Sequence, residues 1–257
     1  APAGAGGPLP ATAVAAELPD FSQYGPIRRE PAPQIRKTIA RQMALSWASV
    51  ARVTHADVAD VTDLDRARKD YNAHLREGET KLTLTAIVVK AVALALRAHP
   101  RLNATYDAVN GEMIFKDYVQ IGVAVDTPRG LVVPVLRDAD RKPLPALAAE
   151  MNDLVSRTRN AKFEISELRG ASFTITNIGP LGGRFFTPMV NFPESAILGL
   201  GRADLQPAVH EGQIVPRLIL PLSLSFDHRG VDGAEAARFC TDLIGALQNP
   251  LRLLALQ

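Results

Sequence analysis

The sequence lacks the features of a secreted, disulfide-bonded protein. It has one cysteine among 257 residues, so no disulfide can form within the chain. A single thiol suits a reducing compartment, which predicts the cytoplasm of a bacterium or a compartment such as the mitochondrial matrix. Cys240 falls in a predicted helix and is expected to be a small buried hydrophobic residue rather than a nucleophile. No basic region followed by an apolar core opens the sequence, so no secretory signal is expected.

Long apolar runs and an excess of one charge are also absent. The most apolar segment, residues 82–98, contains Lys90 and Arg97, which predicts a buried helix rather than a membrane span. The 29 basic and 27 acidic residues leave a formal net charge of +2. Such a balance gives no reason to expect nucleic acid or a membrane surface as a partner.

Several common catalytic and binding motifs are missing. No G-x-G-x-x-G opens a helix after the first strand, and neither a G-x-x-x-x-G-K-[ST] loop nor a G-x-S-x-G elbow occurs. The five histidines are scattered, with no H-x-x-x-H and no cysteine pair, so no metal site is predicted. Four of them fit ordinary positions: His55 in a strand, His74 and His99 in helices, and His210 in a turn.

The composition divides the chain into three parts. Residues 1–20 contain seven Ala, four Pro and three Gly, which predicts a flexible linker left from a longer protein. Residues 21–33 are proline-rich and are expected to form an arm lying on a surface. Residues 34–257 are expected to form one catalytic domain.

Periodicity in the third part predicts alternating helices and strands. Helices are expected at 34–50, 62–76, 83–98, 143–159 and 232–247. Strands are expected at 52–61, 103–106, 113–115, 119–125, 131–136, 172–178, 195–200 and 213–226. Turn residues at 109–111 and 126–130 predict hairpins. The expected fold is a two-layer α/β (α+β) protein with a mixed, largely antiparallel sheet covered by helices.

Residues 222–239 are the densest in chemically active side chains. An apolar strand with alternating serines ends at Asp227, and His228 follows in a turn. Asp232 precedes Glu235 by three residues, which is the spacing of a helix capping box. A histidine in such a turn can accept a proton near neutral pH, because its ordinary pKa is about 6.5. By itself the stretch also fits an ordinary turn histidine and a capping aspartate.

The segment Ser-Phe-Asp-His-Arg-Gly-Val-Asp-Gly-Ala at 225–234 resembles the His-x-x-x-Asp-Gly signature of the dihydrolipoamide acyltransferases. These are the E2 core enzymes of 2-oxo acid dehydrogenase complexes, and they are related in fold and site to chloramphenicol acetyltransferase. Further segments resemble the same family in chain order: 35–43, 119–131, 133–135, 173–179, 182–183 and 193–199. The resemblance covers about residues 21 to 257.

The resemblance implies an acyl transfer between two thiols. His228 would be the general base that takes the proton from coenzyme A or from the dihydrolipoyl arm. The Thr176 hydroxyl would stabilise the oxyanion, and Asp232 would support the loop rather than move protons. Phe186 and Asn191 match positions near the substrate channel. From the residues alone, an ordinary β-branched strand residue is the preferred interpretation of Thr176, and Phe186 equally fits a core residue.

The resemblance also implies an assembly. The family forms homotrimers with the site between subunits, and these build 24-mers or larger cores. The leucines at 251, 253, 254 and 256 are candidates for the contact between trimers, or for a helix end folded onto its own core. Coenzyme A and the lipoyl group would be substrates and carriers. The lipoyl group would be attached to an upstream domain absent here, and the E1 and E3 components would bind through such upstream domains.

Residues 221–225 and 21–25 look most like those of the pyruvate-complex enzymes, which favours acetyl over succinyl or branched-chain groups. Two other functions remain open at this point: a scaffold core without transfer activity, and a drug acetyltransferase of the chloramphenicol type.

Overall fold

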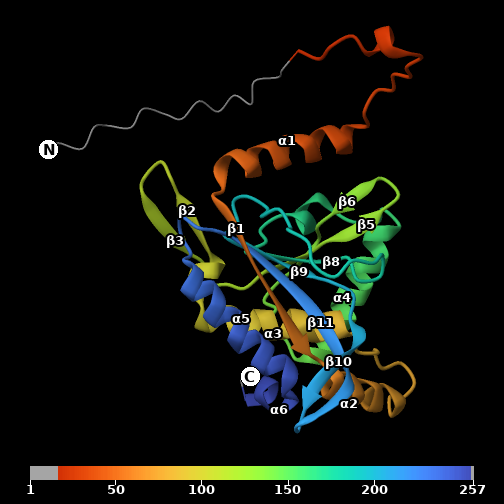
Figure 1. Ribbon diagram of the computed structural model, residues 1–257, viewed down its shortest axis with the longest axis vertical. Coiled ribbons are helices and arrows are strands. Elements are labelled where there is room, and N and C mark those ends of the chain that lie inside the picture. Colours follow the sequence, from red (N-terminus) through yellow and green to blue (C-terminus); the bar gives the residue numbers. More distant parts are fainter. Residues whose placement is uncertain (1–16, 256–257) are drawn as a thin grey trace, which may run out of the picture.

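A computed structural model describes residues 17–255 (Figure 1). Its α-helices are α1 (Gln34–Ser49), α2 (Thr62–Ala73), α3 (Leu84–Ala98), α4 (Leu144–Arg159), α5 (Gly233–Gln248) and α6 (Pro250–Ala255). Three 3-10 helices are η1 (Phe21–Tyr24), η2 (Pro100–Asn103) and η3 (Ile165–Leu168). The linker predicted at 1–20 lies mostly outside the described residues, and the domain boundary at residue 34 stays a prediction.

The strands form one large sheet and two small ones. They are β1 (Arg52–Asp60), β2 (Ala104–Asp107), β3 (Glu112–Phe115), β4 (Ile121–Val123), β5 (Val125–Thr127), β6 (Gly130–Val132), β7 (Val135–Leu136), β8 (Phe173–Asn177), β9 (Ala196–Leu200), β10 (Asp204–His210) and β11 (Gln213–Asp227). The large sheet has the order β1-β11-β9-β8-β4-β7, with β10 paired to the first half of β11. Only the β9–β8 and β8–β4 pairs are parallel. The predicted mixed, largely antiparallel sheet is confirmed.

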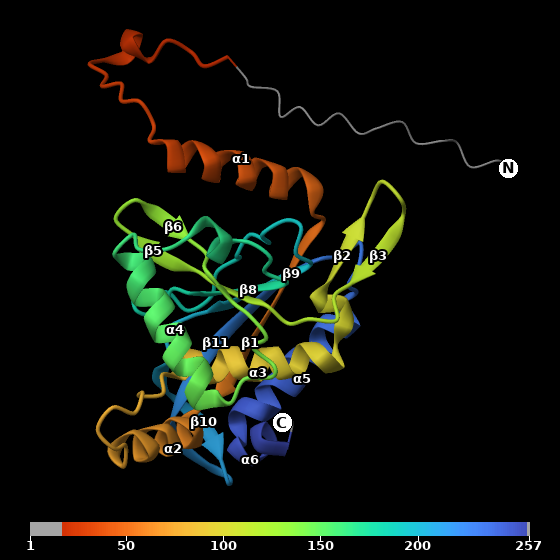
Figure 2. The same ribbon diagram turned by 180° about the vertical axis from the view of Figure 1, so that it is seen from behind.

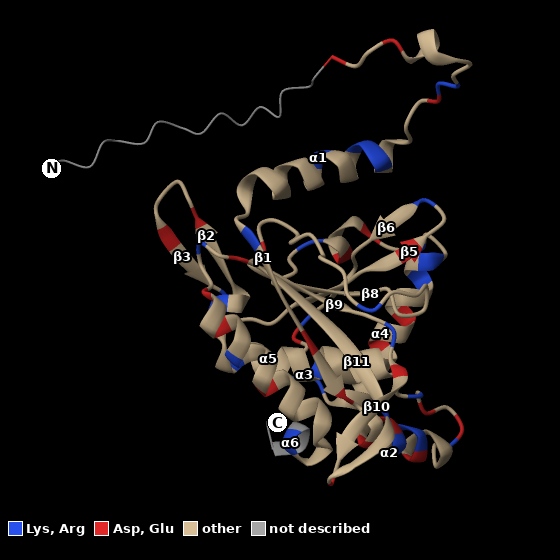
Figure 3. Ribbon diagram, viewed as in Figure 1, with Lys and Arg blue, Asp and Glu red and all other residues tan. Residues whose placement is uncertain are grey.

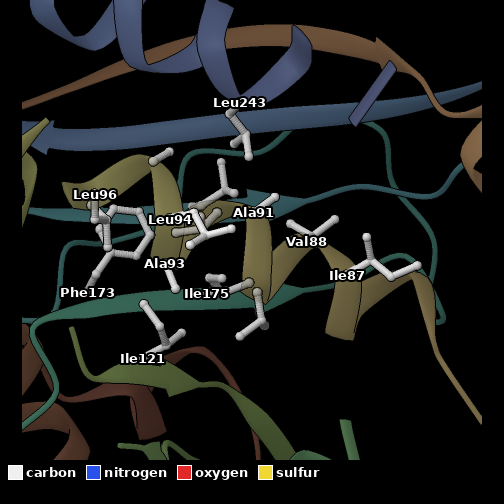
Figure 4. Packing of buried hydrophobic residues seen from close by; sticks show 14 of the residues in the cluster. Ile87, Val88, Ala91, Ala93, Leu94, Leu96, Ile121, Phe173, Ile175 and Leu243 are labelled. Carbon is white, nitrogen blue, oxygen red and sulfur yellow. The ribbon is translucent and has the colours of Figure 1, made fainter. Parts of the chain in front are cut away.

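The hydrophobic core lies between one face of this sheet and helices α3 and α5. Leu222, Leu224 and Phe226 point into it from β11, and Phe173 and Ile175 from β8. Figure 4 shows Phe173 and Ile175 of β8 beside α3, with Leu243 of α5 pointing toward the same helix. Each fully buried leucine or phenylalanine contributes about 1.5–3 kcal/mol. Because successive side chains of a strand point to opposite faces, the residues between these core residues face the other side of the sheet.

Helix α3 is buried on every side from Ala86 to Leu96, so it is more enclosed than an amphipathic surface helix. It contains Lys90, whose ammonium donates to the carbonyl oxygens of Asp140 and Lys142 at 2.7 and 2.8 Å. Burial lowers the pKa of Lys90. The contact fixes the chain just before α4 against α3. None of the helices in the described part of the chain is both long and apolar enough to cross a membrane.

Helix α1 stands apart from the sheet at one end of the molecule (Figure 2). Only Ser46 is buried, and the helix is attached where Gln42 donates to the Phe192 carbonyl oxygen at 2.6 Å. Trp47 is 66% exposed, and the Arg52 guanidinium lies over its ring. Charges of both signs are distributed over the described elements, with basic residues on the first turns of α1 (Figure 3).

The structure adds α6 and the three 3-10 helices to the predicted elements, and it differs from the predicted strands in two places. The hairpin expected over 119–136 is divided, because β4 and β7 belong to the large sheet whereas β5 and β6 form a separate pair. Pro134 lacks the amide hydrogen that a continuous ladder would need. Strand β10 was not predicted, and His210 is its last residue rather than part of a turn. Its Pro207 faces Pro216 across the pair, which is tolerated because β10 lies at an edge.

Candidate active site

His228 lies directly after β11, in the connection to α5, as the sequence predicts. Its amide donates to the Ala51 carbonyl oxygen at 2.9 Å, and the preceding Asp227 amide donates to the Ser195 carbonyl oxygen at 2.8 Å. The His228 side chain is exposed, and its ring centroid is 5.8 Å from that of Phe226. The backbone is therefore fixed from two sides while the imidazole remains accessible to another molecule.

Asp227 and Arg229 hold the turn around His228. The Asp227 carboxylate is 5% exposed and accepts from the Arg229 guanidinium at 2.6 Å. This contact raises the pKa of Arg229. The guanidinium also lies over the Tyr106 ring, 5.0 Å from its centroid. The pair was not predicted from the sequence, although the Asp-His-Arg order places a carboxylate and a guanidinium on either side of the histidine.

Asp232 caps helix α5. Its Oδ1 accepts from the Glu235 amide at 2.8 Å, as the capping-box spacing predicts. The side chain is exposed. This geometry gives Asp232 a direct role in fixing the start of α5, four residues after His228.

Thr176 lies on β8, on the face of the sheet turned away from the core. It pairs with Gly199 of β9, and register partners share a face. The Phe186 ring covers Gly199 so closely that a methyl group added there would lie 2.5 Å from Phe186 Cζ. The structure therefore brings together Thr176 and Phe186, which the sequence predicted separately. Both side chains are half-buried.

Asn191 lies in the loop before β9, which is tied to several elements. Its amide donates to Glu194 Oε1 at 2.8 Å. The Pro193 carbonyl oxygen accepts from the Thr105 hydroxyl, and the Ser195 hydroxyl donates to the Ala104 carbonyl oxygen at 2.7 Å. Glu194 is 3% exposed, and burial raises its pKa to about 7. From the sequence, Glu194 is only part of a motif, because its burial depends on groups distant in sequence, such as Thr174 and Lys116.

The two predicted catalytic side chains are not adjacent in one chain. Gly199, the partner of Thr176, also pairs with Ser223 of β11, which is five residues before His228. A strand advances about 3.3 Å per residue, so His228 lies about 16 Å farther along the strand direction than Thr176. In addition, β9 lies between β8, which carries Thr176, and β11, which His228 follows. A reacting group held by His228 of this chain cannot also contact Thr176 of this chain.

Cys240 and the arrangement of potential metal ligands were the remaining candidates for a chemical role. Burial raises the pKa of the Cys240 thiol to about 12, and the side chain is 1% exposed, so the predicted role as a buried hydrophobic residue is confirmed. Within residues 17–255, no three His, Cys, Asp or Glu side chains are grouped as a metal site would need.

Comparison with protein families identifies relatives over nearly the whole chain. The sequence model of the family described as 2-oxoacid dehydrogenases acyltransferase (catalytic domain) matches residues 24–255. The dihydrolipoyllysine-residue acetyltransferase component of the pyruvate dehydrogenase complex of Haemophilus influenzae is 42% identical over 237 residues. That match covers 91% of this chain and 42% of the relative. The corresponding component of Pseudomonas aeruginosa is 44% identical, over 92% of this chain and 43% of the relative. The chain thus spans less than half the length of these relatives.

Solved structures agree with the sequence comparisons. The dihydrolipoamide acetyltransferase of Azotobacter vinelandii has a TM-score of 0.88 and 41% identity, covering 93% of this chain and 98% of that chain. The cubic core of a pyruvate dehydrogenase multienzyme complex gives the same values. Chloramphenicol acetyltransferase has a TM-score of 0.55 at 12% identity, over 80% of this chain and 94% of that chain, and shows a shared fold alone.

Proposed function

The chain belongs to the family of 2-oxoacid dehydrogenase acyltransferase catalytic domains, and we propose that it transfers an acetyl group between a dihydrolipoyl arm and coenzyme A. One observation carries this proposal. The Azotobacter vinelandii structure was determined to investigate a serine, a histidine and an asparagine in the catalytic mechanism, with the serine 52 positions before the histidine and the asparagine four positions after it. In this chain Thr176 precedes His228 by 52 positions, and Asp232 follows it by four.

The proposed reaction begins with proton transfer to His228. A thiol with a pKa of about 8.5 is only a few per cent ionised at neutral pH, so a positioned base typically accelerates its reaction about 10²- to 10⁴-fold. The exposed imidazole takes the proton from the attacking thiol, and the thiolate sulfur then bonds to the carbonyl carbon of the thioester. The anchored backbone on both sides of His228 supports this role, because it limits the positions that the imidazole can take.

Thr176 is proposed to stabilise the oxyanion that forms in this attack. Its hydroxyl donates a hydrogen bond to the negative oxygen; such a donor contributes about 10²- to 10³-fold. The intermediate then expels the other thiolate, which takes the proton back from His228. The departures from the Azotobacter vinelandii residues are conservative, because Thr keeps the hydroxyl donor and Asp keeps an acceptor for the cap of α5.

We propose that the site is completed by a second copy of the chain in a homotrimer, with His228 from one subunit and Thr176 from the next. The separation of the two residues within one chain supports this arrangement, and so does the similarity to a cubic core. Larger assembly into a 24-mer or a bigger core is part of the same proposal. We propose that other domains of a longer protein carry the lipoyl group and bind the E1 and E3 components. We also propose that the protein is located in a reducing compartment.

The deciding experiment is a thiol-exchange assay with dihydrolipoamide and acetyl-coenzyme A. We expect transfer by the wild-type chain and loss of nearly all transfer in His228→Ala, with the oligomeric state unchanged in sedimentation. Succinyl- and isobutyryl-coenzyme A should react more slowly. An assembled wild-type protein without transfer would show a scaffold instead, and faster acetylation of chloramphenicol than of dihydrolipoamide would show a drug acetyltransferase.

A further inference from the structure

Glu194 is a buried carboxyl group that the proposed chemistry does not use. It is 3% exposed and lies in the loop between Asn191 and β9. A buried carboxyl group is costly unless it is hydrogen-bonded or neutralised, and replacing it with an apolar residue would remove that cost. The presence of a buried carboxyl group in the loop that holds Asn191 therefore calls for a functional explanation.

The first contact of Glu194 is with Asn191, the predicted substrate-channel residue. Glu194 Oε1 accepts from Asn191 Nδ2 at 2.8 Å, and the Glu194 amide donates to the Asn191 carbonyl oxygen at 2.9 Å. The side chain and the backbone of Glu194 thus both bind the same residue. The orientation of the Asn191 amide depends on this carboxyl group.

The second contact of Glu194 is with strand β8. The Thr174 hydroxyl is close enough to lower the pKa of Glu194, although neither Thr174 Oγ1 nor Glu194 Oε2 makes a well-aligned hydrogen bond. Both atoms are buried. Thr174 is two residues before Thr176 on the same strand, so both side chains leave the same face of the sheet.

The third connection leads toward His228. The residue after Glu194, Ser195, accepts the Asp227 amide hydrogen bond at the end of β11. A displacement of the loop at Glu194 would therefore move one of the two anchors that hold His228.

We propose that Glu194 is a positioning residue for acyl transfer, whose carboxyl group fixes the Asn191 amide against the strand that carries Thr176. The proposal rests on the proposed function. Glu194 does not need to contact either substrate for this role. It acts through Asn191, whose amide it binds beside the strand that carries Thr174 and Thr176.

The protonation state of Glu194 decides which hydrogen bonds it can make. Burial raises its pKa to about 7, opposed by the hydroxyl of Thr174, the amide of Asn191 and the ammonium of Lys116. Lys116 is the charged group acting on it, and its own pKa is lowered by burial. The protonated carboxyl can donate to Thr174, whereas the carboxylate can only accept from it. Glutamine at this position resembles the protonated form, since its amide nitrogen can donate and its amide oxygen can accept a hydrogen bond.

The test compares Glu194→Gln and Glu194→Ala with a control, Glu150→Gln, which changes a surface carboxylate paired with Lys142. We expect Glu194→Ala to lower kcat for acetyl transfer about tenfold to a hundredfold, because the site groups lose their fixed positions. Glu194→Gln should keep most of kcat near neutral pH but alter the dependence of kcat on pH between about pH 6 and 8. Glu150→Gln should match the wild type in both respects.

Two results would overturn the proposal. One is a Glu194→Ala variant with wild-type kcat. The other is a Glu194→Gln variant whose kcat and pH profile both equal those of the wild type; this measurement also decides the matter if the alanine variant fails to fold. If the proposed function itself is wrong, the wild-type chain will show no acetyl transfer, which distinguishes that result from the two above.

Discussion

Thr176 lies on β8, whereas His228 directly follows β11, five residues beyond the row of Thr176, and β9 separates these two strands. Their separation along the strands is about 16 Å, far more than one thioester carbonyl and its attacking thiol can span. The chain therefore presents a base at one place and an oxyanion donor at another. In the homotrimer that we propose, closed cyclic symmetry would solve this problem, because each copy would offer its His228 to one neighbour and its Thr176 to the other.

Mixed assemblies of two inactive variants should regain activity. His228→Ala and Thr176→Val chains are each expected to be nearly inactive alone, because every site lacks either the base or the donor. In a random equal mixture, about a quarter of the interfaces combine an intact His228 with an intact Thr176. The chains should be unfolded and refolded together, and transfer rates compared with unmixed samples. Absence of any recovery in properly mixed trimers would place both groups in one chain.

Thr176→Ser is the matched control for the oxyanion donor. Serine keeps the hydroxyl, so we expect it to retain most of kcat, whereas Thr176→Val should lose about 10²- to 10³-fold. Valine has nearly the same shape as threonine and suits a strand, so stability should change little. Equal kcat values for the serine and valine variants would show that Thr176 is only a strand residue.

Two replacements of Asp232 distinguish a role in capping α5 from a role in proton transfer. Asp232→Asn preserves an acceptor for the Glu235 amide, whereas Asp232→Ala removes it and should destabilise the protein by about 1 kcal/mol. We expect Asp232→Asn to retain most of kcat, because the cap supports the loop without carrying a proton. The measurements are thermal unfolding at fixed protein concentration and the transfer rate. A loss of kcat in Asp232→Asn as large as that in His228→Ala would contradict this role.

Gly199→Ala should disturb the site through Phe186. The added methyl group would lie 2.5 Å from Phe186 Cζ, so the ring must move, at a cost of about 1–3 kcal/mol. Phe186→Leu in the same chain removes the end of the ring and should recover part of the stability. Gly233→Ala serves as the stability control, since nothing lies within 4 Å of its added carbon. Strictly additive effects of the Gly199 and Phe186 changes would rule out the contact.

Glu194 should make stability depend on pH. Its pKa is about 7 in the folded chain and 4.5 as the ordinary value, so between these pH values the folded state holds the proton more tightly. Stability therefore falls as pH rises through this window and levels off above it. At about 1.4 kcal/mol per pKa unit, the loss amounts to about 3 kcal/mol. Unfolding of wild type and Glu194→Gln should diverge between about pH 5 and 8. Parallel curves would contradict this prediction.

Local patterns predicted most of the elements, because the physics behind them is local. Residues 83–98 formed the expected helix, with Thr83 capping it and Pro100 following its end. The alternation of serines with leucines on β11 correctly placed its polar face, and the spacing of Asp232 and Glu235 correctly placed a helix cap. The one strand that was missed, β10, contains a proline and is stabilised by pairing at a sheet edge rather than by its own composition.

The sequence by itself determined the element types, the mixed sheet and the chemical groups available for acyl transfer. Each follows from neighbouring residues or from a motif read along one strand or turn. Only the tertiary structure decided which groups meet. It joined Asp227 to Arg229 over Tyr106, placed Phe186 on Gly199 beside Thr176, and buried Glu194 between Asn191 and Thr174. It also separated Thr176 from His228, because their distance depends on strand order and register, which arise from pairing between segments far apart in the chain.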